Sequence, residues 1–301
     1  MTDPLTRRFR ELKPKASELT IKTYKNNILR LRRVSNDLRY PEISNYLKKL
    51  NPVIARNLLT AVIVLEGRAR FGPLYDGLIA EARNLRGTQT FSQAERSNWS
   101  SVKAINAGLA RAKFDVDRLR LLETRKLNGK EYQILQTYFV LRFHSEFHWR
   151  SDLASIRIGH HPGENYLLNG KFYLNKFKTA KHFARKKLLP LVFTPLKGLG
   201  TLLRKFLAVR AAQDLGDTDY LLTNRKKQPF TRSAYQKFLA SGSYRYVGKR
   251  LGPSMWRKIY VTDYLKLNPG LSKKKKKMRE MMQLSLETHE SYARMNLDEP
   301  D

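Results

Sequence analysis

Four residues of types that can act on a phosphate group stand in order along the chain. They are Arg150 in "FHWRSDLASIRI", Lys178 in "NKFKTAK", Arg257 in "SMWRKIYVTDYL" and Tyr292 in "MMQLSLETHESYARM". A guanidinium can hold two phosphate oxygens, an ammonium can protonate a leaving oxygen, and a phenolate can attack phosphorus. Arg257 is the most unusual, because apolar and aromatic residues surround it just behind a Gly252-Pro253 turn.

Other chemistries have little support in the sequence. The six histidines are scattered, and only His160 and His161 are adjacent, which is a spacing that rarely chelates a metal. The absence of cysteine excludes disulfides and thiolate metal sites. No glycine-rich phosphate loop and no Ser-His-Asp spacing can be found, so ATP hydrolysis and serine hydrolase chemistry are not expected. We therefore expect neither a metal ion nor another cofactor.

In order, spacing and context, the four motifs resemble those of the tyrosine recombinase (phage integrase) family, in particular the divergent integrases of viruses and mobile elements. The resemblance covers nearly the whole chain. "LTIKTYKNNILRL" is similar to the start of the family's helical core-binding domain, and "QAERSNW" resembles a segment that opens the catalytic domain. The resemblance implies an enzyme that cleaves and rejoins DNA through a 3′-phosphotyrosine intermediate, which conserves the energy of the phosphodiester bond.

The resemblance assigns two arginines to the phosphate. Arg150 would be the first, and Asp152 looks like the acidic residue that orients it. Arg142 fits this role less well, because no acidic residue follows it in the same pattern. Arg257 would be the second, on a helix packed into the core beside Trp256. Two fixed guanidiniums can stabilise the transition state without a metal.

The general acid and the nucleophile are assigned in the same way. Lys178 matches the lysine of the family's β-hairpin, which protonates the leaving 5′ oxygen, although Lys176 and Lys181 are close enough to compete for the role. Tyr292 matches the nucleophile by its position after Arg257, which distinguishes it from the other tyrosines among the fifteen in the chain.

The sequence departs from the family at its histidine positions. Ser254 stands where the first histidine is usual, and Lys258 stands where a second often follows. Leu284 takes the histidine position before the nucleophile, or Gln283 does in a register shifted by one. A serine can donate a hydrogen bond to a phosphate oxygen, but it cannot act as an imidazole base. His289 could supply an imidazole, or it could be an exposed helix residue.

The net charge of +33 is distributed through the whole chain and calls for a polyanionic partner. Double-stranded DNA is the expected partner, and the family resemblance implies a homotetramer on two DNA sites. Alternatives are a DNA-binding protein with this fold and weak or lost catalysis, or a type IB topoisomerase. Composition alone also fits a ribosomal-type packing protein or a membrane-surface binder.

The first part of the chain is expected to be a helical DNA-binding domain over residues 1–87. Apolar residues recur at helical spacing in residues 17–33, and the following segments begin at Pro41 and Pro52. Gly, Thr, Ser and Asn interrupt the pattern, so residues 88–98 are predicted to be a linker.

Residues 99–301 are expected to form the catalytic domain. Helices are predicted at 99–125, 129–144, 195–213 and 231–249, and short β-prone runs in 153–194 predict a small antiparallel sheet. The predicted class is therefore mainly α (α+β), of the tyrosine recombinase type.

Neither the start of the sequence nor any later segment predicts a membrane-associated protein. "MTDPLTRRFRELKPK" lacks the apolar segment of a secretory signal, and no apolar run approaches the length of a membrane span. The absence of cysteine fits a reducing compartment. We therefore expect an intracellular protein, in the host cell or nucleus if it is viral.

Overall fold

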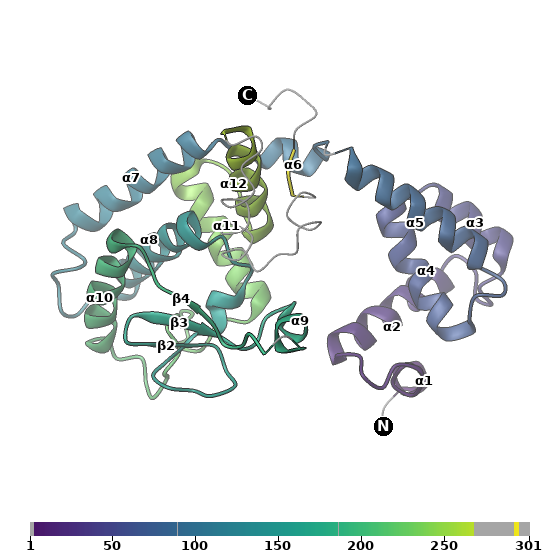
Figure 1. Cartoon of the computed structure of the whole chain (residues 1–301), viewed down its shortest axis with the longest axis horizontal. Helices are drawn as coiled ribbons and strands as arrows, with labels where there is room; N and C mark the ends of the chain where they lie inside the picture. The colour runs from purple at the N-terminus through teal and green to yellow at the C-terminus, as the bar shows by residue number, and fades with distance from the viewer. Residues whose placement is uncertain (1–2, 89, 186, 268–291, 295–301) are drawn as a thin grey trace. The chain divides into compact units, whose positions relative to one another are not determined.

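The computed structural model of the chain describes residues 3–88, 90–185, 187–267 and 292–294. The chain divides into two compact units, Met1–Gln89 and Thr90–Asp301 (Figure 1). Over its described residues the first unit is helical, whereas the second combines helices with one small sheet. The predicted mainly α class is confirmed. None of the described helices combines the length and apolar character that a membrane crossing requires.

Three of the five helices described in the first unit begin at a side-chain cap. The five are α1 (Pro4–Leu12), α2 (Glu18–Arg32), α3 (Tyr40–Lys48), α4 (Pro52–Glu66) and α5 (Gly72–Gly87). The side chains of Asp3, Ser17 and Asn51 accept backbone N–H groups of α1, α2 and α4. Pro4 and Pro52 occupy first positions, where a missing N–H does no harm.

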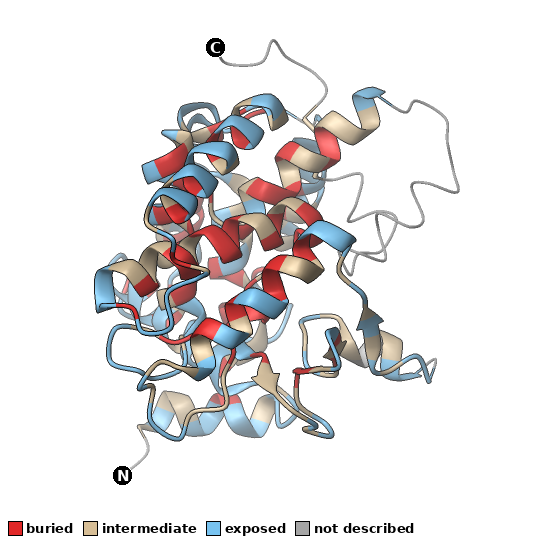
Figure 2. Cartoon of the chain, turned by 90° about the vertical axis from the view of Figure 1, so that its left-hand side faces the viewer, coloured by how far each residue is buried: buried red, intermediate tan, exposed pale blue. Residues whose placement is uncertain are grey.

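A continuous apolar core joins these helices. Its members include Phe9, Ile21, Ile28, Leu31, Leu38, Ile43, Leu47, Leu58, Leu59, Val62, Phe71 and Leu78. Helices in Figure 2 have buried residues along one face and exposed residues along the other. The helical periodicity read from the sequence therefore corresponds to a real core, and the first unit has enough buried surface to fold around it.

The second unit is built around one buried helix. Its helices are α6 (Gln93–Asn98), α7 (Val102–Arg118), α8 (Gly129–Phe147), α9 (Ala180–Arg185), α10 (Lys197–Ala211), α11 (Arg232–Val247) and α12 (Pro253–Leu267). Helix α8 contacts α7, α10, α11 and α12. The expected core positions Tyr132, Leu135, Tyr138 and Phe139 are all buried, and Phe139 stacks on Phe206 at 4.5 Å between ring centroids.

A small sheet follows the end of α8. Its strands lie in the order β1 (Arg157–Ile158), β2 (Tyr166–Leu168), β3 (Lys171–Leu174) and β4 (Leu191–Phe193). The Asn169-Gly170 pair joins β2 to β3, and both residues have positive φ, as a tight hairpin turn requires. The pairs β2–β3 and β3–β4 are antiparallel as predicted, but β1 pairs with β2 in parallel. The loop of residues 159–165 crosses over and allows that orientation.

The stretch predicted as a linker, residues 88–98, contains a short capped helix. Ser92 accepts the N–H of Glu95, and the carboxylate of Glu95 accepts the N–H of Ser92, which is a capping box. Phe91 and Trp99 flank α6, meet edge to face at 4.5 Å, and belong to the core of the second unit. Because these residues are held by that core, the division between the units falls at residues 89 and 90.

A close helix contact gives a test of the packing. Gly108 of α7 faces Tyr246 and Val247, and a Cβ added there would lie 2.9 Å from the backbone oxygen of Tyr246. We expect Gly108→Ala to lower the free energy of unfolding by about 1–3 kcal/mol through overpacking. Gly200→Ala in α10 is the control, because its Cβ would make ordinary contacts and alanine favours the helix by up to about 1 kcal/mol. Denaturant unfolding measures both, and equal effects would contradict the packing.

Candidate active site

Arg257 lies in the core of the second unit. Helix α12 places it between Trp256 and Ile259. The side chains of Arg257 and Trp256 are both fully buried. Its Nε donates a hydrogen bond of 2.7 Å to the backbone oxygen of His148, the left-handed residue that ends α8. Burial lowers the pKa of Arg257 to about 10, with a contribution from the charge of Arg150. The guanidinium therefore remains protonated at neutral pH and has a fixed orientation.

Arg150 follows α8 by three residues and brings a second guanidinium close to the first. It is half-buried, and its charge acts directly on Arg257. Among the described residues, its Nη1 is buried without a hydrogen-bond partner. Two adjacent cations, one of them in the core, form a site that favours an anion.

Asp152 lies beside these arginines, at the start of the short 3₁₀ helix Asp152–Ser155. Its carboxyl is buried. Burial raises the pKa of Asp152, and the charges of Arg257, Arg232 and Arg150 oppose that rise. Arg232, the exposed first residue of α11, was not anticipated from the sequence, and no local pattern distinguishes it from other arginines.

Tyr292 completes the cluster. Tyr292 and Ala293 pack against Val261 of α12, and the Arg257 guanidinium lies 5.9 Å from the centre of the Tyr292 ring. Burial would raise the pKa of Tyr292, but the charges of Arg257 and Arg150, and hydrogen bonds with both, lower it below its ordinary value. Two guanidiniums and one phenol thus meet at one place.

The other predicted residues lie apart from this group or outside the described residues. Lys178 is exposed in the connection between β3 and β4, which contains α9 and is longer than the expected hairpin turn. Ser254 is exposed in the first turn of α12. Lys258 is directed to the carboxylate of Glu95 and forms an ion pair with it. Leu284 lies outside the described residues.

The competing candidates can be placed in part. Lys176 is ion-paired with Glu164, whereas Lys178 has no ion pair with any described residue. Arg142 donates to Ser145 and lies near Glu146, and it is not among the charges that lower the pKa of Tyr292. Gln283 and His289 also lie outside the described residues, and nothing is described of the side chain of Lys181.

One imidazole next to the arginines was missed by sequence reasoning. His148 is buried, stacks on Tyr260 at 4.0 Å, and its Nδ1 hydrogen bonds to the backbone oxygen of His144. Because a carbonyl only accepts, Nδ1 carries the proton and Nε2 keeps its lone pair. Burial first, and then Arg257, lowers the pKa of His148 to about 4, so it is neutral at physiological pH. The segment "FHSEFHWR" could have indicated this residue, because it places two histidines one helical turn apart before Arg150.

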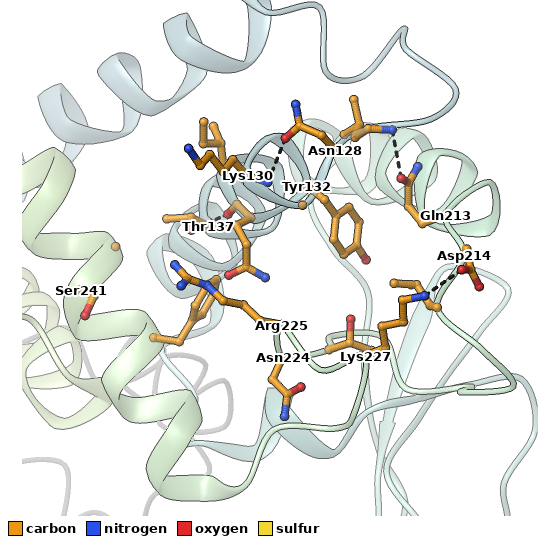
Figure 3. A pocket seen from close by; sticks show the side chains of 18 of the residues that line it. Asn128, Lys130, Tyr132, Thr137, Gln213, Asp214, Asn224, Arg225, Lys227 and Ser241 are labelled. Atoms are coloured by element: carbon orange, nitrogen blue, oxygen red, sulfur yellow. Dashed lines mark hydrogen bonds and ion pairs between the residues drawn. The ribbon is translucent and has the colours of Figure 1, made fainter.

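A cavity of about 1150 Å³ lies at the opposite end of α8 from Arg150. It is lined by the first turns of α8, by α11 and by the loop before α11 (Figure 3). Lys126, Lys130, Arg225, Lys227 and Arg245 contribute to its wall, and Asp214 pairs with Lys227 at 2.7 Å. None of the clustered arginines or Tyr292 lines it, so it is separate from the candidate active site. In the described parts of the chain, no three His, Cys, Asp or Glu residues gather as a metal site would require.

Comparison with known proteins identifies the architecture. No protein-family model and no curated protein sequence matches the chain. Among solved structures, the site-specific recombinase XerH bound to its difH substrate, in a pre-cleavage complex, matches with a TM-score of 0.52. The match covers 97% of this chain and 82% of XerH at 14% sequence identity. The chain has the tyrosine recombinase fold.

A second solved structure, that of the XerA recombinase, is similar over 98% of this chain and 94% of XerA, at 16% identity and a TM-score of 0.47. At such identities a structural match establishes the fold and nothing about activity. The function must therefore be argued from the residues of the site itself.

The arrangement of the arginines can be tested by titration of Tyr292. Replacing Arg150 with glutamine removes one positive charge and one hydrogen bond, so the pKa of Tyr292 should rise. Nuclear magnetic resonance of isotope-labelled tyrosine measures it, with the Tyr292 signal identified by its loss in Tyr292→Phe. Arg142→Gln is the matched control and should leave that titration unchanged. An equal shift in both variants would mean that Arg150 has no special place beside the phenol.

Proposed function

We propose that the protein is a site-specific DNA recombinase or integrase that cleaves and rejoins strands through a 3′-phosphotyrosine intermediate. The observation that carries this proposal is the meeting of Arg150, Arg257 and Tyr292 in the second unit. The recombinase fold supports it, and the XerH structure contains that protein's DNA substrate. The net charge of +33 supports a polyanionic partner.

The two arginines bind the scissile phosphate. The transition state concentrates negative charge on the nonbridging oxygens, and Arg150 and Arg257 present protonated forks that can share those oxygens. The hydrogen bond to His148 and the packing of Trp256 fix Arg257 before DNA arrives. Asp152 lies beside both and limits their mutual repulsion. Little reorganisation is then needed during the reaction.

Tyr292 is the nucleophile. Its oxygen forms a bond to phosphorus and the bond from phosphorus to the 5′ oxygen breaks. The phenol proton passes to solvent water, and the 5′ oxygen takes a proton from the general acid. The arginines lower the pKa of Tyr292, so its ionisation requires a weaker base than an ordinary tyrosine does. The lowered pKa compensates for the absence of histidine at Ser254 and Lys258, where the family resemblance would place it. Rejoining reverses the step, and the bond energy stays in the phosphotyrosine, so no nucleotide is consumed.

Lys178 is the proposed general acid for the 5′ oxygen. It lies on the connection that leaves β3, and its ammonium has no ion pair among the described residues. Such a proton donor on an exposed connection can approach the leaving oxygen from the DNA side. Its neighbour Lys176 is neutralised by Glu164, which makes it the poorer candidate.

Binding to DNA involves both units in this proposal. The helical first unit, Met1–Gln89, contributes phosphate contacts, and the second unit carries the chemistry. Phosphate contacts supply affinity that falls with salt, and base contacts with DNA deformability supply site choice. A homotetramer on two DNA sites and an origin in a virus or mobile element remain predictions from the sequence resemblance.

The nucleophile can be tested with suicide DNA substrates, in which the cleaved 5′ end diffuses away. Wild-type protein should form adducts that survive denaturation, and Tyr292→Phe should form none, because the attacking oxygen is missing. Arg257→Lys should slow adduct formation by about 10²–10³-fold, since a point charge does not reproduce the fork. Tyr244→Phe, at an exposed position of α11, should match wild type.

The same assay separates the alternative functions. DNA binding without adducts on any substrate would indicate a recombinase fold that has lost catalysis. Adducts accompanied by supercoil relaxation, with no requirement for a second DNA site, would indicate a topoisomerase. Either result would contradict the proposal that the protein is a site-specific recombinase.

The general acid has a separate test. Lys178→Ala should slow cleavage by about 10²–10⁴-fold on normal DNA, because the 5′ oxygen leaves without a proton. On a substrate with sulfur in place of that oxygen, the variant should react nearly as fast as wild type, since a thiolate is a good leaving group. Lys176→Ala, which removes an equally exposed but ion-paired lysine, should be unaffected on both. Loss of activity on both substrates would exclude Lys178 as the acid.

A further inference from the structure

Glu95 has more partners than a helix cap needs. It is the third residue of α6, and its Oε2 accepts the N–H of Ser92 at 2.8 Å in the capping box. Its side chain is nevertheless almost fully buried, which a helix cap does not require. A buried carboxylate must be matched by cations or donors, because an isolated one is strongly unfavourable.

The matching cations come from two distant parts of the chain. Nη2 of Arg294 lies 2.8 Å from Oε1 of Glu95, and Nε of Arg294 lies 3.3 Å from Oε2, which makes a bidentate pair. The ammonium of Lys258, on α12, contacts the same Oε1. All three side chains are mostly shielded from solvent, with exposures of 8% for Glu95, 12% for Arg294 and 20% for Lys258. Ion pairs of this kind are screened far less than surface pairs.

Arg294 is two residues beyond the candidate nucleophile. Its backbone N–H donates to the hydroxyl of Thr262 at 3.0 Å, and Ala293 packs against Val261. The segment 292–294 thus contacts the rest of the second unit through a backbone hydrogen bond, a small apolar contact and the arginine cluster, as well as through Glu95. A bidentate, charge-assisted pair of this kind is stronger than a hydrogen bond between neutral groups.

We propose that Glu95 is a positioning residue that holds Tyr292 against Arg150 and Arg257 of its own chain, by pairing with Arg294 and Lys258. The inference rests on the proposed function, because it assigns a purpose to placing the phenol there. It also explains why Lys258 does not face the phosphate. The ammonium completes the neutralisation of a carboxylate that anchors the nucleophile segment.

The substitution Glu95→Gln removes the ion pairs of Glu95 but keeps its role in the helix cap. Glutamine serves the capping box as well as glutamate does and has nearly the same volume, so α6 should persist. The matched control is Glu131→Gln, because Glu131 occupies the same position in the capping box of Asn128 at the start of α8. Glu131 has no contact with the segment 292–294 among the described residues. Arg294→Ala removes the tether from the other side.

The first readout is the titration of Tyr292 in the full chain without DNA. In Glu95→Gln and in Arg294→Ala, the phenol should leave the arginines, and its pKa should rise towards the ordinary value of about 10. The Glu131→Gln protein should titrate as wild type does. An unchanged Tyr292 titration in Glu95→Gln overturns the inference, whether or not the protein cleaves DNA.

The second readout is single-turnover adduct formation with suicide DNA. Glu95→Gln should lose at least about tenfold in rate with little change in DNA affinity, since only the alignment of the nucleophile is disturbed. The double variant with Arg294→Ala should be no slower than the slower single variant, because both remove the same tether. A wild-type protein that forms no adduct, but whose Tyr292 titration shifts on Glu95→Gln, would refute the proposed reaction and leave the anchoring intact.

Discussion

The buried guanidinium of Arg257 is the constraint on which the second unit depends. A cation in the core is tolerated only when its N–H groups are hydrogen-bonded and its charge is compensated. The backbone oxygen of His148 accepts a hydrogen bond from Arg257, and Asp152 and Tyr292 stabilise its positive charge. These partners come from the end of α8, the 3₁₀ helix and the segment 292–294. Placing one arginine in the core therefore forces three distant parts of the chain to converge.

The departures from the recombinase pattern are consistent with this electrostatic organisation. A site without histidines at Ser254 and Lys258 has less capacity to remove a phenol proton, but close guanidiniums reduce the need for a base. The backbone oxygen of His148 accepts a hydrogen bond from Arg257 and orients it, while the neutral imidazole of His148 stacks on Tyr260. Lys258 pairs with the buried carboxylate of Glu95. Arg150, Arg257 and Tyr292 come together although histidine is absent from positions 254 and 258.

Sequence reasoning succeeded where a local pattern carries the information. Helical periodicity located the core helices, and the Asn169-Gly170 pair located the hairpin. Motif order grouped Arg150, Arg257 and Tyr292 as candidate site residues, and their roles stay predictions. Sequence reasoning failed for Arg232, His148 and Glu95, because their importance comes from neighbours far away in sequence. Glu95 in particular reads as an ordinary helix cap, and only the tertiary fold supplies Arg294. The short helix α6 was missed for a related reason, since six polar residues show no apolar periodicity.

The location of α6 along the chain has a mechanical consequence. It begins four residues after the first unit ends, and its carboxylate is tied to the segment that bears the phenol. Because Phe91 and Trp99 hold both sides of α6 in the core of the second unit, motion at the connection is absorbed there before it reaches the segment that bears the phenol. The position of Tyr292 is therefore set by contacts within the second unit.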